Sequence, residues 1–388
     1  MKKLRFSPRF TPQILWILAP LVLSGIVLTW RLGTSPAGIS ATELDQCSGA
    51  MPAVYAPYYW LMHLLPVDCG VNHTFWLRLP SVLFAMLAGT LFVTAVKNWF
   101  GHRTAIYAAA LFLLASWFLH AGRLAAPEVM LLAIVPAWLA LFQRARFNPD
   151  SRLTGLYAVL TISLTLFVPG GIWFVLLAAI WKGNKAISFL RRIPVKLTIP
   201  MVAIPLAASI YLIIGLSQHQ AQLWTWMGWP GEQPWLTILR HIAAVPFHLF
   251  ARGPEAPMLW LAHRPILDVF TTAMVIIGSI RIIRHASHPK LIVIIALSIV
   301  CVVLTGLRAS GIATLNLIVP LMYFLAAGGI HAMLRRWFQI FPRNPFAKWL
   351  AYSLMAIVVT GAVILNLRDY FVAWPNSTAT RQVFSIKP

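Results

Sequence analysis

Acidic and basic side chains are the residues of this sequence that could do chemistry, and both stand between long apolar segments. Among 388 residues there are 9 Asp and Glu and 31 Lys and Arg. A carboxylate can take or give a proton, and the planar guanidinium of Arg binds phosphate through two parallel hydrogen bonds. Any chemistry of these side chains would take place at the ends of the apolar segments. The acids are Glu43, Asp45, Asp68, Glu128, Asp150, Glu232, Glu255, Asp268 and Asp369.

Several catalytic motifs are absent from the sequence. It contains no Gly-x-x-x-x-Gly-Lys phosphate loop, no His-Glu-x-x-His, no Cys-x-x-Cys and no nucleophile elbow. Nucleotide chemistry in the cytosol is therefore disfavoured.

The elements that must position these residues are membrane-spanning helices. The chain is 60% hydrophobic and only 10% charged, with a mean hydropathy of +0.78, far from the composition of a soluble domain. The net charge of +22 could suggest nucleic acid, but Lys and Arg form short clusters between apolar segments instead of one hydrophilic face. Such clusters set membrane topology, so no nucleic-acid partner is expected.

A spanning helix needs about 20 mostly apolar residues, and such runs recur along the chain. Pro169-Gly170-Gly171 predicts a tight turn, so the fifth and sixth runs form an antiparallel hairpin. The sequence predicts an all-α, polytopic membrane protein, one transmembrane domain over 1–388, with about eleven spans and with interfacial helices in its outer loops. The predicted spans lie near 13–30, 80–97, 104–120, 126–143, 153–168, 171–182, 197–215, 265–283, 290–307, 312–330 and 348–366.

Positive charge near the helix ends predicts the orientation. With the N-terminus inside, most Lys and Arg lie in cytoplasmic segments such as the 182–196 linker. Every acid except Asp150 then falls outside, which suggests an acidic functional surface there, although so few residues can also sort by accident. The apolar run from Ile14 to Trp30 is long enough to span and has no clear cleavage site, so we expect an uncleaved first helix.

Two outer loops are long enough to do more than connect helices, and an outer tail covers 367–388. The first loop, 31–79, carries an aromatic amphipathic stretch over Tyr55–Leu65 that suits a helix lying at the membrane interface. The second loop, 216–264, is rich in Trp and His and is the expected lid over an outward cavity.

The cysteines agree with this orientation. Cys47 and Cys69 share the first loop, where an oxidising compartment would let them pair, although two reduced thiols are equally compatible with the sequence. Cys301 lies alone in an apolar run.

Five short motifs occur in order along the chain. They are His73-Thr-Phe-Trp-Leu-Arg78-Leu-Pro80-Ser81, Trp99-Phe-Gly101-His-Arg103, Gly122-Arg123-Leu-Ala-Ala-Pro127-Glu128, Arg264-Pro265-Ile-Leu-Asp268 with Gly278, and Arg308 followed by Asn316-Leu-Ile-Val-Pro320. Over about residues 13–330 this order resembles the core of the GT-C glycosyltransferases, in particular the bacterial branch related to protein O-mannosyltransferases and the lipid A aminoarabinose transferase. Each motif is weak alone, and the order is the more specific signal.

The resemblance implies that a sugar, hexosyl or pentosyl, moves from a polyprenyl-phosphate donor to an acceptor hydroxyl, with inversion. The acceptor would be a lipid, a glycan or a protein, and the active face would lie outside a bacterial cytoplasmic membrane. Such a transfer needs an acidic general base, and positive charge or a metal must stabilise the departing phosphate. A divalent metal between Glu43, Glu128 and a loop His is one option, but the sequence has no spaced ligand motif that makes any cofactor certain.

The same resemblance assigns candidate catalytic residues. The family has an adjacent Asp-Glu pair where this sequence has Thr42-Glu43, with Asp45 two residues on. The base is therefore Glu43 or Asp45, or the site is impaired, and either acid could also be a solvated loop residue. Glu128 matches the acid that closes an Arg-x-x-x-Pro-Asp pattern, although helix capping alone could explain it.

Further residues are expected to bind the substrates. Arg123 and Arg308 at outer helix ends are the predicted phosphate contacts, with snorkelling to lipid headgroups as the alternative for each. Arg78, before Pro80, is expected to be a helix-entry and lipid-anchor residue. Candidate substrate contacts in the outer loops are Tyr58, Trp226 and His248.

Two other function classes stay open. A transporter or lipid flippase would place ionisable groups inside the spans and often contain internal repeats, and the sequence has neither feature clearly. The other class is a GT-C-like scaffold that has lost its activity, because Thr42 and Glu128 depart from the family pattern.

Overall fold

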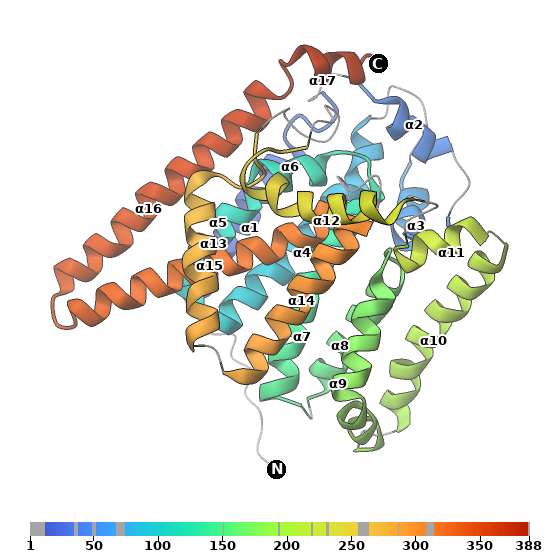
Figure 1. Cartoon of the computed structure of the whole chain (residues 1–388), viewed down its shortest axis with the longest axis horizontal. Coiled ribbons are helices and arrows are strands. Elements are labelled where there is room, and N and C mark those ends of the chain that lie inside the picture. The colour runs from blue at the N-terminus through green and yellow to red at the C-terminus, as the bar shows by residue number, and fades with distance from the viewer. Residues whose placement is uncertain are drawn as a thin grey trace.

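Figure 1 shows the computed structural model of the chain, which describes residues 12–34, 38–48, 52–66, 74–149, 151–192, 195–218, 220–229, 233–254, 264–285, 287–307 and 314–386. Within these ranges the regular structure is helical, apart from one isolated antiparallel bridge between Ile39 and Ile386. The predicted fold class is confirmed. This chain is an all-α, polytopic membrane protein.

The helices follow one another along the chain in two halves of similar number. The first half of the chain forms α1 (Pro12–Thr29), α2 (Ala41–Ser48), α3 (Ala56–Leu64), α4 (Thr74–Phe100), α5 (His102–Leu113), α6 (Ser116–Arg123), the 3₁₀ helix η2 (Pro127–Met130), α7 (Leu131–Phe147), α8 (Arg152–Leu166) and α9 (Gly171–Arg192). The second half forms α10 (Val195–Gln218), α11 (Gln220–Met227), α12 (Trp235–Phe250), α13 (Val269–His285), α14 (His288–Leu307), α15 (Leu315–Ile340), α16 (Pro345–Arg368), the π-helix η3 (Asp369–Ala373) and α17 (Thr378–Val383).

Every predicted span contains a helix, but fewer than eleven reach full spanning length. In the described part of the chain, six segments are long and apolar enough to cross a membrane, or seven if the bent pair of α5 and α6 counts as one. The six are Thr74–Phe100, Pro127–Phe147, Ile199–Gln218, Pro289–Leu307, Leu315–Ile340 and Pro345–Asn376. Shorter apolar helices cover Leu18–Thr29, Arg152–Leu166, Gly171–Ile180 and Trp235–Phe250.

The predicted span over 104–120 is broken in two. Helices α5 and α6 are bent by 59° relative to each other, and Ala115 between them has an extended backbone. The N–H of Ser116 bonds with the side-chain oxygen of Asn366 at 3.0 Å instead of continuing the α5 ladder. The bend buries all eight residues of α6, including Arg123 at its end.

Other helices run past their predicted ends. Helix α4 begins at Thr74 with Pro80 inside it, α9 continues through the basic linker to Arg192, and α15 continues to Ile340. An apolar run ends at the first charged residues, whereas a helix can continue beyond the hydrocarbon region as long as its backbone bonds are made within the helix. These three helices are therefore longer than the spans predicted for them.

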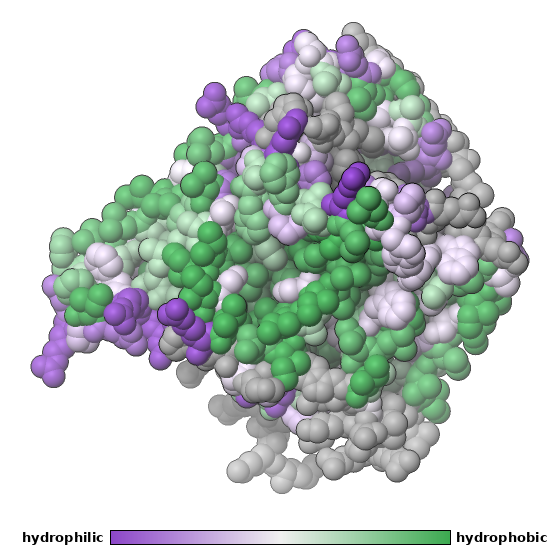
Figure 2. Space-filling model, in the orientation of Figure 1, coloured by the Kyte–Doolittle hydropathy of each residue, from purple (hydrophilic) through white to green (hydrophobic). Residues whose placement is uncertain are grey.

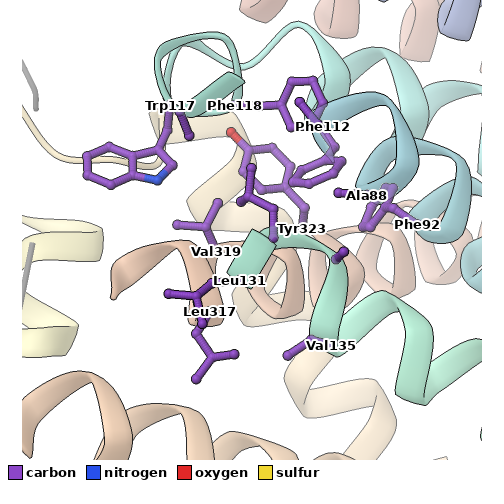
Figure 3. Packing of buried hydrophobic residues seen from close by; sticks show 14 of the residues in the cluster. Ala88, Phe92, Phe112, Trp117, Phe118, Leu131, Val135, Leu317, Val319 and Tyr323 are labelled. Atoms are coloured by element: carbon purple, nitrogen blue, oxygen red, sulfur yellow. The ribbon is translucent and has the colours of Figure 1, made fainter. Parts of the chain in front are cut away.

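The core lies where α4, α5, α7 and α15 pack together. Figure 3 shows aromatic rings from three of these elements and from α6 in contact: Phe92 and Phe112 have ring centroids 4.2 Å apart, and Phe112 lies 4.9 Å from Phe118 and 5.4 Å from Tyr323. Every residue of α15 from Leu315 to Ile330 is buried. Because lipid is as apolar as these side chains, close packing holds such helices together.

Helices α10 and α16 lie at the edge of the bundle. Only 11% of the apolar segment of α10 is buried inside the protein, against 83% for α15. Their outward residues are large and hydrophobic, and Figure 2 shows hydrophobic surface along the flanks of the molecule. Such a surface is suited to contact with lipid chains.

Helices α8 and α9 form the predicted hairpin. Gly170 has a φ of +71°, and a Cβ at Gly171 would lie 1.7 Å from the carbonyl oxygen of Thr165. The N–H of Gly170 also bonds with the carbonyl of Trp226 at 2.8 Å, so the turn is joined to α11. Glycine is required here for both backbone conformation and space.

Helices α13 and α15 make the closest backbone approach. A Cβ at Gly278 would lie 1.9 Å from the carbonyl oxygen of Leu325, and one at Gly329 would lie 2.1 Å from that of Met274. Small residues at such crossings let helix backbones meet in a membrane.

We expect Gly278→Ala and Gly329→Ala each to lower the free energy of unfolding by about 1–3 kcal/mol, because an added methyl group has no room between two backbones. Thermal unfolding of the purified protein in one detergent measures the effect. Gly361→Ala is the matched control, since a Cβ there meets no described atom within 4 Å. Alanine should be neutral or stabilising at that helical position. Equal melting temperatures for all three variants would contradict the tight crossing.

Candidate functional site

One end of the bundle gathers the segments that the sequence predicted to be outside. We name it the loop face and define it by residues 38–48, 52–66, 123–130, 266–268, 314–316 and 366–386. Contacts join these segments: the N–H of Ile39 donates to the carbonyl of Ile386 at 2.8 Å, and the side-chain N–H of Asn316 donates to the carbonyl of Glu128 at 3.1 Å. In Figure 1, α2, α6 and α17 lie together at this end. Which side of a membrane it faces stays a prediction.

Glu43, in the first turn of α2, organises the loop face. Its carboxylate binds Arg78 of α4 through two parallel bonds, from Nε to Oε1 at 3.0 Å and from Nη2 to Oε2 at 3.1 Å. Both side chains are 0% exposed. A two-point pair of this kind fixes both partners, and burial makes either charge costly without the other.

The Glu43 carboxylate also accepts the Ser40 hydroxyl at 3.3 Å and two backbone N–H groups. It accepts the N–H of Ser40 at 3.1 Å and that of Ala125, between α6 and η2, at 3.0 Å. The carboxylate therefore joins α2, α4 and the start of η2. This geometry gives Glu43 a positioning task, and its predicted role as the base stays untested.

Arg78 is not a lipid anchor, and that expectation is wrong. Its guanidinium donates to the carbonyls of Leu32 at 3.2 Å and Gly38 at 2.9 Å as well as to Glu43. All of these partners lie inside the protein, and Arg78 is buried within α4 rather than at a helix entry. The apolar residues around Arg78 in the sequence gave no sign of a partner 35 positions away.

Arg123, the predicted phosphate contact, is also fully buried. Its Nη1 donates to the carbonyls of Val27, Leu28 and Trp30 at 2.7–2.9 Å, and its Nε donates to the Tyr370 hydroxyl at 3.1 Å. These carbonyls are at the C-terminus of α1, where a cation complements the helix dipole. Arg123 thus caps α1, and its contact with a phosphate stays a prediction.

Glu128 lies in η2, at the start of the span Pro127–Phe147, and is partly buried. Tyr58 and Tyr59 of α3 lie close enough to Glu128 for its charge to affect the pKa of their hydroxyls. Burial, with a smaller contribution from Glu128, raises the pKa of Tyr59 to about 12. Burial raises the pKa of Tyr58 even further, and the Tyr58 hydroxyl shares a 3.0 Å bond with that of Ser81. Both tyrosines stay protonated at neutral pH.

Asp45, the third acid predicted for catalysis, does not join this cluster. Asp45 is exposed on α2, on the opposite side of that helix from Glu43. Thr42 is exposed, and its hydroxyl lies 3.1 Å from that of Ser40. Arg308 lies outside the described residues, as do Cys69 and the side chain of Cys47, so their roles stay predictions.

The three predicted substrate contacts lie in different surroundings. Tyr58 is packed inside the protein, so contact with a substrate would require the packing to open. Trp226 of α11 donates its indole N–H to the carbonyl of Leu166 at 2.7 Å. His248 lies near the end of α12, with Nδ1 at 3.1 Å from the carbonyl of Arg252.

Trp226 also lines an apolar cavity of about 640 Å³ below the loop face. Helices α8, α9 and α10 form its walls with Leu166, Ile172, Leu212 and Leu216, and two serines of α10 are its polar residues. A cavity of this size and lining is suited to a hydrocarbon chain.

No three His, Cys, Asp or Glu side chains within the described ranges lie close enough to hold a metal ion together. Glu43 does not fit such a site, because its oxygens are engaged by Arg78 and by backbone N–H groups. The metal between Glu43 and Glu128 stays a prediction, and no chemistry is derived through it.

Sequence reasoning missed the polar residues that tie the helices together beneath the loop face. Asn366 of α16 accepts the N–H and the hydroxyl of Ser116 at 3.0 and 2.8 Å, and donates to Asp268 at 3.3 Å. Asn316 of α15 bonds with Trp117 and Glu128. An Asn inside an apolar run is the signal that could have revealed these residues. Burial of an amide is costly unless it is hydrogen-bonded, so such an Asn is expected to bond with a neighbouring helix.

No family model and no curated protein matches this sequence. Among solved structures, the chain is similar to the crystal structure of the Archaeoglobus fulgidus oligosaccharyltransferase tethered by a disulfide bond to an acceptor peptide that contains the NVT sequon. The TM-score is 0.49 and the sequence identity 10%, and the match covers 96% of this chain. This chain spans only 56% of the length of that protein, so the similarity assigns neither family nor activity.

We expect Glu43→Gln to lower the free energy of unfolding by about 3–5 kcal/mol, because it leaves the Arg78 charge buried without its partner. The double variant Glu43→Gln with Arg78→Met should recover part of this loss. Thermal unfolding in one detergent is the measurement.

The ion pair of Arg264 with Asp369 is the matched control, since the Arg264 side chain is 56% exposed. Asp369→Asn should change stability by less than about 1 kcal/mol. If Glu43→Gln and Asp369→Asn shift the melting temperature equally, the buried pair does not organise the loop face.

Proposed function

We propose that this chain is a GT-C-like glycosyltransferase that moves a sugar, hexosyl or pentosyl, from a polyprenyl-phosphate carrier to an acceptor hydroxyl. The acceptor would be a lipid, a glycan or a protein, and the loop face would lie outside a bacterial cytoplasmic membrane. Glu128 is the general base in this proposal, and Glu43 holds the segment that carries Glu128. The resemblance of the motif order to the GT-C enzymes supports the class of reaction.

The placement of Glu128 is the observation that carries the proposal. Glu128 begins the span Pro127–Phe147 on the loop face, and the buried hydroxyls of Tyr58 and Tyr59 lie within reach of its charge. Asp45 is exposed on a surface helix. Glu128 is partly buried at a helix start on the loop face, where a carboxylate is held but still partly accessible.

The tyrosines beside Glu128 are poor alternatives as the base. Their raised pKa values keep both hydroxyls protonated near neutral pH, so Tyr58 and Tyr59 can donate a hydrogen bond but cannot take a proton. Glu128 is therefore the proposed proton acceptor of this cluster.

The apolar cavity supports a lipid-linked donor. Its walls come from α8, α9 and α10, and α10 lies at the lipid-facing edge of the bundle. Trp226 lines the cavity and bonds with the Gly170 turn, which lies at the end of the bundle near the loop face. A prenyl chain placed there would bring its phosphate close to that face. Arg308, which lies outside the described residues, is kept from the sequence as the proposed phosphate contact.

The proposed reaction is a single displacement. Glu128 takes the proton of the acceptor hydroxyl while the acceptor oxygen bonds with the anomeric carbon of the sugar. The bond from that carbon to the phosphate oxygen breaks, its electron pair leaves with the phosphate, and the carrier departs as polyprenyl phosphate. One displacement at this carbon inverts its configuration.

We expect Glu128→Gln to lower kcat by about 10²–10⁴-fold with little change in melting temperature, because the amide cannot take the proton. Purified protein is incubated with polyprenyl-phosphate-linked hexoses and pentoses and mixed acceptors, and released polyprenyl phosphate is measured. Asp45→Asn, which also removes one carboxylate from the loop face, is run in parallel and should retain most activity.

Two results would reject the proposal. If wild-type protein consumes no carrier across the donor panel, it is not a transferase of this kind. If Asp45→Asn loses activity and Glu128→Gln does not, the base is assigned to the wrong acid. Movement of a labelled lipid or solute across liposomes that carry the protein, without sugar transfer, would instead support a transporter or flippase.

A further inference from the structure

Three buried side chains from distant parts of the sequence hold the backbone turn that carries Glu128. The N–H of Ala125 donates to Glu43 at 3.0 Å, and the N–H of Ala126 lies 3.4 Å from the hydroxyl oxygen of Ser81. The carbonyl of Glu128 itself accepts the side-chain N–H of Asn316 at 3.1 Å. The turn is thus held from α2, α4 and α15.

The orientation of the Asn316 amide is fixed by its other partner. The indole N–H of Trp117 can only donate, and it lies 2.8 Å from Oδ1 of Asn316. The NH₂ group must then face the Glu128 carbonyl. Asn316 is 6% exposed and Trp117 is 2% exposed, so water does not compete for these bonds.

Ser81 is held in a similar way. Its hydroxyl bonds with the Tyr58 hydroxyl at 3.0 Å, and Tyr58 and Ser81 are both 0% exposed. The N–H of Ala126 also contacts the Leu124 carbonyl at 2.9 Å, so Ser81 adds a second acceptor to a tight turn. Glu43 in turn is fixed by its pair with Arg78.

We propose that Asn316, Ser81 and Glu43 are positioning residues that fix the place of the backbone from which the Glu128 carboxylate extends. This inference rests on the proposed function, because it gives the three residues a part in the same reaction. None of them touches a reacting atom. The backbone that carries Glu128 is bonded to buried groups at the N–H of Ala125, at the N–H of Ala126 and at the Glu128 carbonyl, so the Cα from which the carboxylate extends has little freedom to move. A displacement of about 1 Å at a reacting group can lower a rate about 100-fold.

The test uses full-length Asn316→Asp in lipid nanodiscs. The new side chain has almost the same size and still accepts the Trp117 N–H, but its carboxylate cannot donate to the Glu128 carbonyl. We expect amide hydrogen exchange over residues 124–128 to become about tenfold faster. We expect kcat to fall about 10- to 100-fold while KM for the donor changes less than about twofold, because binding groups are untouched.

Asn376→Asp is the matched control. Asn376 also donates its amide to a backbone carbonyl, that of Val372 at 2.9 Å, but it lies at an exposed position away from the turn. This variant should leave exchange and kcat unchanged. Ser81→Ala is the second test variant, with the same direction of change and a several-fold effect, and it decides the matter if Asn316→Asp does not fold.

The possible results are distinct. Unchanged exchange over 124–128 in both variants would overturn the positioning proposal, and so would faster exchange with an unchanged kcat. A wild-type protein that releases no sugar from any donor would reject the proposed function instead. The exchange data alone would then decide whether the three side chains hold the turn.

Discussion

The buried ion pair of Glu43 with Arg78 is the interaction on which the loop face depends. Both charges lie in a dry interior, where neither is tolerated without the other. The N–H groups of Arg78 that Glu43 does not accept donate to the carbonyls of Leu32 and Gly38, and Glu43 also accepts the N–H of Ala125. One ion pair thereby sets the relative positions of the end of α1, the start of α2, α4 and η2.

A division of tasks follows from this arrangement. The charges with the most complete bonding, Glu43, Arg78 and Arg123, lie inside the protein and hold segments together. Glu128 lies at the boundary of this network, with its backbone held from inside and its side chain partly accessible. A rigid support beneath one accessible carboxylate is what acid–base chemistry at a membrane surface requires. Glu43 and Glu128 both follow apolar runs in the sequence, but local packing buries Glu43 and leaves the Glu128 side chain partly accessible.

The sequence predicted the helices well because a bilayer requires long apolar runs, and those runs are directly visible. The positions of Glu43 and Glu128 at one end of the bundle also follow from counting helices. The partners of Arg78 and Arg123 could not be predicted, because they are carbonyls and a carboxylate brought close only by folding. The break between α5 and α6 was missed for the same reason, since it depends on Asn366, about 250 positions along the chain.

The bridge between Ile39 and Ile386 has a consequence for biogenesis. Ile386 and the neighbouring Phe384 come after every spanning helix in chain order, yet a Cβ at Gly38 would lie only 2.3 Å from the Phe384 carbonyl oxygen. The segment that leads into α2 therefore lacks its contact with residues 384–386 until the spanning helices between them have been synthesised. The loop face is completed only when synthesis has passed residue 386, so an early loop and a late tail mature together.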